Sequence, residues 1–121
     1  MTSEEIIVRV SAGELGATLN VPDAPQALVI FAHGSGSSRF SARNRFVAEK
    51  LDEAHFATLL LDLLTQEEDR CDQLTAEYRF DVDLLARRLL AATDWSKERF
   101  AHRRMRLGYF GASTGAAAAL I

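Results

Sequence analysis

The chain contains a single cysteine, Cys71, among its 121 residues. One cysteine cannot form an internal disulfide or build a cysteine-based zinc site, so a disulfide scaffold and a zinc finger are both excluded. Internal repeats and low-complexity segments are absent as well. The composition, with 48% hydrophobic and 26% charged residues, is typical of a globular domain that folds around a hydrophobic core.

Long hydrophobic runs and a strong excess of one charge are also missing. No apolar run approaches the roughly 20 residues of a membrane span, and residues 1–5 are acidic where a signal peptide is basic. The net charge of -3 and the pI of 5.6 provide no attraction for nucleic acids or acidic membranes. We therefore expect a cytoplasmic protein with no nucleic-acid, membrane, metal or cofactor partner.

Alternating and continuous apolar runs predict the strands. Apolar residues alternate over residues 6–10 and again over residues 15–21, with Gly13 between them, so an antiparallel hairpin is expected first. Ala27–Ala32 is continuously apolar, as a strand buried on both faces should be. The apolar segments Phe56–Leu61 and 105–110 predict a second and a third buried strand.

Apolar residues at helical spacing separate these strands and predict helices over residues 42–54 and 80–92. The two stripes consist of Phe46, Val47, Leu51 and Ala54, and of Phe80, Leu84, Leu85, Leu89 and Ala92. Arg87 and Arg88 are expected to face solvent, and the acidic stretch 66–72 is expected to be a solvated loop. The order of elements predicts an α/β protein with a mixed, mostly parallel sheet, an antiparallel N-terminal hairpin and crossover helices.

The stretch Gly111-Ala112-Ser113-Thr114-Gly115 carries the most specific functional signal. It follows an apolar strand and precedes the helix-forming run 116–121, which is the context of a nucleophile elbow. In such a turn the serine hydroxyl is exposed, and glycines two residues before and after it let strand and helix approach. Ser113 is therefore the predicted nucleophile.

A glycine-containing loop, residues 33–39, follows the first buried strand and should face the same crevice as the elbow, because ligands bind at the carboxyl ends of such strands. Acyl transfer needs backbone N–H donors for the developing oxyanion. We predict Thr114 as one donor and Ser35 as the other, with Gly34 and Gly36 as alternatives to Ser35.

His33-Gly34-Ser35-Gly36 after a buried strand, followed later by the Gly111–Gly115 elbow, resembles the α/β-hydrolase fold, and within it the serine hydrolases similar to dienelactone hydrolase. The resemblance covers nearly the whole chain and implies that residues 1–121 are the N-terminal portion of a single domain with an incomplete C-terminal half. It also implies a hydrolase of a small ester, thioester or lactone. Dienelactone hydrolases proper carry cysteine at the elbow, where this chain has Ser113, so an ordinary serine ester hydrolase is favoured.

The base that would activate Ser113 is not evident in the chain. In this fold the order is serine, then aspartate or glutamate, then histidine, whereas His33, His55 and His102 all precede Ser113. We expect these histidines to be structural or surface residues. An unassisted serine is a weak nucleophile, so residues 1–121 alone are predicted to be inactive or nearly so.

Arg39, with His33, Gly34 and Gly36, is a candidate for substrate binding. Arg39, Arg43 and Arg45 would attract an anionic substrate, or they form an ordinary helix surface with Glu49 as a partner. A phosphate-binding loop is disfavoured, because the Gly-Lys-Ser/Thr ending is missing.

Asp62, which ends the second buried strand, is expected to orient a loop, contact substrate or form a turn. Two classes of function remain. The first is a serine hydrolase, for which acyl transfer or haloperoxidase chemistry on the same elbow is an open variant. The second is a non-catalytic fragment or half-domain that requires a partner chain and self-associates through an exposed sheet edge.

Overall fold

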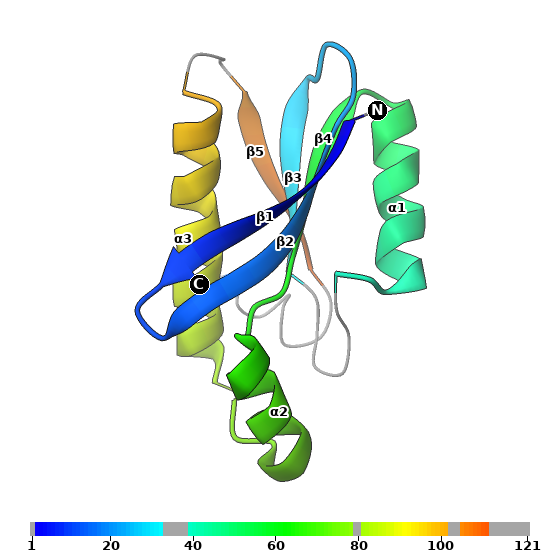
Figure 1. Cartoon of the computed structure of the whole chain (residues 1–121). Helices are drawn as coiled ribbons and strands as arrows, with labels where there is room; N and C mark the ends of the chain where they lie inside the picture. The colour runs from blue at the N-terminus through cyan, green and yellow to red at the C-terminus, as the bar shows by residue number, and fades with distance from the viewer. Residues whose placement is uncertain (1, 33–38, 79–80, 102–104, 112–121) are drawn as a thin grey trace.

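The computed structural model describes residues 2–32, 39–78, 81–101 and 105–111. In that part of the chain the elements are β1 (Thr2–Val10), β2 (Gly13–Val21), β3 (Ala27–Ala32), α1 (Ala42–Glu53), β4 (Phe56–Leu61), α2 (Gln66–Thr75), α3 (Val82–Arg99) and β5 (Arg106–Gly111). The five strands form one sheet in the order β1-β2-β4-β3-β5 (Figure 1). The predicted α/β class is confirmed.

The sheet is mixed, as the sequence predicts. β1 and β2 form an antiparallel hairpin in which Val10 pairs with Gly13, leaving a two-residue turn. Gly13 has a φ of 143°, a conformation that side chains disfavour, so glycine is required at this turn. β2 is also antiparallel to β4, whereas β3 is parallel to both β4 and β5.

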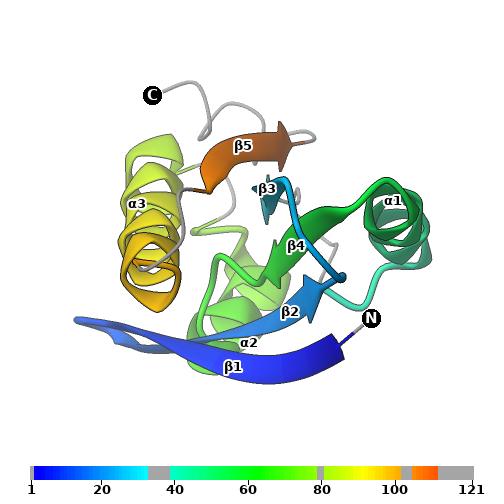
Figure 2. The ribbon, with the colours of Figure 1, turned by 90° about the horizontal axis from the view of Figure 1, so that it is seen from above.

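The sheet is covered on both faces, because α1 and α3 lie on opposite sides of it (Figure 2). Alternate residues of β3 enter different cores: Leu28 and Ile30 belong to the larger core with α3, and Phe31 to the smaller core with α1. All three are at most 1% exposed. This burial on both faces explains why the central strands are continuously apolar.

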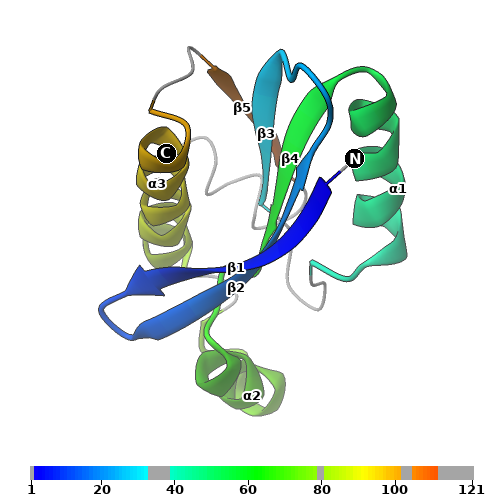
Figure 3. The ribbon, with the colours of Figure 1, turned by 45° about the horizontal axis from the view of Figure 1, so that its top comes forward.

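The acidic stretch 66–72 is part of helix α2, so the prediction of a solvated loop there is wrong. The Thr65 hydroxyl accepts the backbone N–H of Glu68, and the Glu68 carboxylate accepts the backbone N–H of Thr65, which forms a capping box. Three acidic residues in the first turn also stabilise the helix, because their negative charges lie near the positive, N-terminal end of the helix dipole. The same acidity that resembles a loop in the sequence therefore stabilises a helix start. Figure 3 shows α2 below the sheet.

Arg88 is buried, so the prediction that it faces solvent is wrong, whereas Arg87 is exposed as expected. The Arg88 guanidinium donates Nη1 and Nη2 to the two carboxylate oxygens of Glu68, at 2.6 and 2.8 Å. It also donates to the carbonyl oxygen of Leu63 at 3.3 Å. This bidentate ion pair joins α3 to the start of α2, just beyond the carboxyl end of β4.

The pKa of Glu68 is held below its usual value of 4.5, first by the hydrogen bond from Arg88, while partial burial opposes the shift. A carboxyl whose pKa is lower in the folded state stabilises the protein above its unfolded pKa and loses this contribution as the pH falls through the folded pKa. We expect the difference in unfolding free energy between wild type and Glu68→Gln to shrink as the pH falls below 4.5. Urea unfolding between pH 7 and about pH 3 would measure it, and a constant difference over this range would contradict the assignment.

Some apolar side chains predicted to line the helices are exposed. Phe46 of α1 is 57% exposed, although Val47 and Leu51 pack against the smaller core as expected. The prediction that residues 105–110 form a buried strand is wrong in its burial: β5 lies at an edge of the described sheet, and its Tyr109 and Phe110 are 46% and 38% exposed. No helix among the described residues is long and apolar enough to cross a membrane.

Candidate functional site

The carboxyl ends of the three parallel strands lie level with one another at one edge of the sheet. Ala32, the last residue of β3, pairs with Leu61 of β4 on one side and with Gly111 of β5 on the other. The chain segments that follow these residues therefore leave the sheet at neighbouring points. This edge is where open sheets of this kind bind ligands.

Most of the predicted site residues lie outside the described residues. These are His33, Gly34, Ser35, Gly36, Ser113 and Thr114. The structure describes the residues on which their segments depend: Ala32 before the first segment, Arg39 after it, and Gly111 before the second. The roles assigned to the six residues stay predictions.

Arg39 is bound to Asp62, the residue that follows β4. The backbone N–H of Arg39 donates to Asp62 Oδ1 at 2.8 Å, and its guanidinium Nη1 forms an ion pair with Asp62 Oδ2. The two side chains are 21% and 22% exposed. Of the roles considered for Asp62, orienting a loop is therefore the one that its contacts match.

The guanidinium of Arg39 also lies over the β1–β2 hairpin. Its Nε is 3.4 Å from the Glu5 carboxylate, which in turn accepts hydrogen bonds from the Thr18 hydroxyl at 3.0 Å. A Cβ atom added at Gly16 would come within 2.7 Å of Arg39 Nη1, so only glycine leaves room for the guanidinium in this position. The sequence did carry a signal here, because glycine inside a strand often marks a close approach of another group.

Two arginines lie over the ring of Phe40, with the guanidinium carbons of Arg39 and Arg45 at 4.2 and 5.0 Å from its centre. Phe40 is 50% exposed. The predicted basic group thus exists beside the carboxyl edge, but Arg39 within it is paired with carboxylates of β1 and of the segment after β4 rather than with Glu49.

Comparison with solved structures places this arrangement among known folds. A dienelactone hydrolase from Anabaena variabilis is 50% identical in sequence and superposes with a TM-score of 0.93 over 99% of this chain and 56% of that one. The esterase Pf2001 from Pyrococcus furiosus, at 21% identity, gives a TM-score of 0.78 over 98% of this chain and 45% of its own. Est1E from Butyrivibrio proteoclasticus, at 20% identity, gives 0.72 over 94% and 42%.

The chain has an α/β-hydrolase fold. The predicted resemblance is confirmed, both in strand order and in similarity to a dienelactone hydrolase. No family model matches the sequence.

The curated relatives carry a different name. Two Mycobacterium tuberculosis proteins, from strains CDC 1551 / Oshkosh and H37Rv, are called "Putative phosphoribosyl transferase" and are each 49% identical over all 121 residues. The chain spans 26% of the length of these relatives. Their name therefore describes proteins about four times as long as the region that matches.

His55 is distant from the carboxyl edge of the sheet. It precedes β4, at the amino end of that strand, with a φ of 68°. Its ring Nδ1 lies 3.2 Å from the carbonyl oxygen of Asp23. These contacts match the expected structural role at a helix-to-strand junction.

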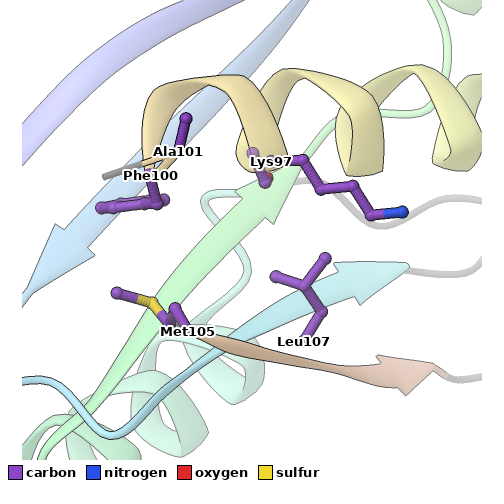
Figure 4. Close-up of a pocket in the computed structure, with 6 residues that line it drawn as sticks. Lys97, Phe100, Ala101, Met105 and Leu107 are labelled. Atoms are coloured by element: carbon purple, nitrogen blue, oxygen red, sulfur yellow. The ribbon is translucent and has the colours of Figure 1, made fainter. Parts of the chain in front are cut away.

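A pocket of about 160 Å³ lies between α3 and β5, lined by Ser96, Lys97, Phe100, Ala101, Met105 and Leu107 (Figure 4). Met105 precedes β5, so the pocket lies at the amino end of that strand, opposite the carboxyl edge. Phe100 is 8% exposed and belongs to the larger core. The described residues contain no group of three or more His, Cys, Asp or Glu side chains placed to hold a metal ion.

Proposed function

We propose that this chain is the nucleophile-bearing part of a serine hydrolase that acts on a small ester, thioester or lactone. Ser113 would attack the substrate carbonyl carbon, and the backbone N–H groups of Thr114 and Ser35 would stabilise the oxyanion. His33, Gly34 and Gly36 would line the substrate site, whereas Arg39, the fourth residue predicted there, pairs with Asp62 and Glu5.

The observation that carries this proposal is the register of the strand ends. Ala32 pairs directly with Gly111, so the loop that begins at His33 and the elbow that contains Ser113 start from adjacent backbone positions on parallel strands. An oxyanion hole needs one donor from each of these two segments. The 50% identity to a dienelactone hydrolase supports the same class of reaction.

The reaction needs a base to remove the Ser113 hydroxyl proton and return it to the leaving group. Among the histidines of the chain, His55 is held at the opposite edge of the sheet, by its position before β4. We therefore expect negligible turnover from residues 1–121 alone, with the acid and the histidine supplied by other residues of a longer protein. A cytoplasmic location and a small ester-like molecule as the substrate are parts of the same proposal.

Labelling with a fluorophosphonate probe tests the nucleophile. We expect the full-length protein to be labelled covalently at Ser113, and Ser113→Ala to be unlabelled, because the probe reacts with an activated serine hydroxyl. Ser41→Ala is a matched control, since the Ser41 side chain makes no capping hydrogen bond at the start of α1. Equal labelling of wild type and Ser113→Ala would show that Ser113 is not the nucleophile.

Two alternative functions can be distinguished from a serine hydrolase by simple assays. A half-domain that requires a partner chain would pair through the edge strand β5, whose Tyr109 and Phe110 are partly exposed, and would change its oligomeric state with concentration. Phosphoribosyl transfer, taken from the name of the curated relatives, would consume 5-phosphoribosyl diphosphate in a reaction that Ser113→Ala leaves unchanged.

A further inference from the structure

We propose, on the basis of the hydrolase function above, that Arg39 is a positioning residue for the oxyanion hole. Its pairing with Asp62 fixes the end of the segment 33–38, which carries the second backbone donor. The segment begins at Ala32, which is fully buried in β3, and ends at Arg39. Both ends are therefore held to neighbouring strands of the same sheet.

Asp62 holds Arg39 by two separate groups. One carboxylate oxygen accepts the backbone N–H and the other pairs with the guanidinium, so both the position and the orientation of the Arg39 backbone are restrained. Asp62 is itself restrained, because its backbone N–H donates to the carbonyl oxygen of Gly16 at 3.0 Å. The restraint therefore runs from the β1–β2 hairpin through Asp62 to the segment that follows β3.

The β1–β2 hairpin provides both the space and a second carboxylate for the Arg39 guanidinium. Gly16 leaves the space that it occupies, and Glu5, held by Thr18, provides a second carboxylate on the strand β1. Most of the Arg39 side chain is shielded from water, since it is 21% exposed. A partly buried carboxylate that binds both the backbone N–H and the guanidinium of one residue restrains the backbone more strongly than an exposed surface ion pair does.

The consequence for catalysis follows from the geometry of oxyanion stabilisation. A donor must lie about 2.7–3.1 Å from the position that the oxyanion occupies in the transition state, and a misplacement of about 1 Å costs roughly 100-fold in rate. Loosening Arg39 is therefore expected to lower kcat, with little effect on KM, because the ground-state carbonyl gains little from these donors.

The test compares Arg39→Met, Arg39→Lys and Gly16→Ala in the full-length protein. Turnover of p-nitrophenyl acetate and of mono-p-nitrophenyl glutarate is measured per active site titrated with a fluorophosphonate. We expect kcat to fall by about 10- to 100-fold for both esters in Arg39→Met, with KM within about twofold of wild type. Arg39→Lys should recover part of the loss, because it retains the positive charge that pairs with Asp62.

Gly16→Ala provides the sharper variant, because it displaces the guanidinium without removing any charged group. We expect it to lower kcat in the wild-type background and to have no further effect when Arg39 is already methionine. The matched control is Arg99→Met, which removes another arginine paired with a β1 glutamate, Glu4, at 3.0 Å. Its kcat should equal that of wild type.

Two results would overturn the positioning role. An unchanged kcat per active site, together with a lower Tm, would show that Arg39 only stabilises the fold. An increase in KM for the anionic glutarate ester alone would show that Arg39 contacts the substrate instead. A Ser113→Ala protein that keeps more than about a tenth of the wild-type kcat would overturn the proposed hydrolase function, and the positioning role with it, so the two failures are distinguishable.

Discussion

Replacing Ser113 by alanine is expected to lower the esterase kcat of the full-length protein by about 10³- to 10⁶-fold. The alanine removes the atom that forms the acyl-enzyme bond, while the backbone N–H groups of the oxyanion hole remain. The residual activity should therefore still exceed that of the uncatalysed reaction. Steady-state turnover of p-nitrophenyl acetate, with protein concentration determined by absorbance, measures the change.

Cys71→Ser is the matched control for this experiment, because it replaces the chain's single cysteine, whose thiol is the alternative nucleophile. Cys71 lies on α2, where its thiol contacts the side chains of Thr75 and Glu77. We expect Cys71→Ser to retain the wild-type kcat. A Ser113→Ala protein that keeps more than about a tenth of the wild-type kcat would contradict the nucleophile assignment.

Replacing Arg88 by methionine is expected to lower the free energy of unfolding by about 3 kcal/mol, at the lower end of the range for breaking a buried ion pair. Methionine fills much of the space but leaves the Glu68 carboxylate without its cation. The Glu68 side chain is 12% exposed and still accepts the backbone N–H of Thr65, which limits the loss. Urea unfolding monitored by circular dichroism measures the change.

Combining Arg88→Met with Glu68→Gln distinguishes two causes of the lost stability: the loss of the Arg88–Glu68 attraction, and the presence of a buried Glu68 carboxylate without its cation. The glutamine keeps an acceptor for the Thr65 N–H but carries no charge, so the double variant should be more stable than Arg88→Met alone. Arg9→Met is the control, because Arg9 forms an exposed pair with Glu14 at 3.8 Å, and its effect should be within about 0.5 kcal/mol. A double variant less stable than Arg88→Met would contradict the interpretation.

The elements that sequence reasoning predicted correctly are those with a strong local pattern. Alternation predicted the β1–β2 hairpin, and the mostly apolar runs predicted β3 and β4, because strands buried on both faces are rich in apolar residues. The carboxyl edge was also predictable, since parallel strands joined by crossover helices all end on one side.

The helix α2 was missed although its signal was present in the sequence. Thr65 followed three positions later by Glu68 is the pattern of a capping box. It was outweighed by the acidity of residues 66–72, which resembles a solvated loop. The burial of Arg88 had no comparable local signal, because its partner Glu68 lies 20 positions away in the sequence.

The sequence by itself determined the class of fold, the bounds of β3 and β4 and the choice of Ser113 as the predicted nucleophile, because these depend on periodicity and on short motifs. Only the tertiary structure decided what surrounds them. Arg39 lies 23 positions from Asp62 and 34 from Glu5, and no local pattern encodes a contact over such separations. Their meeting depends on the order of the strands, which brings β1, β2 and the end of β4 together beside the start of α1.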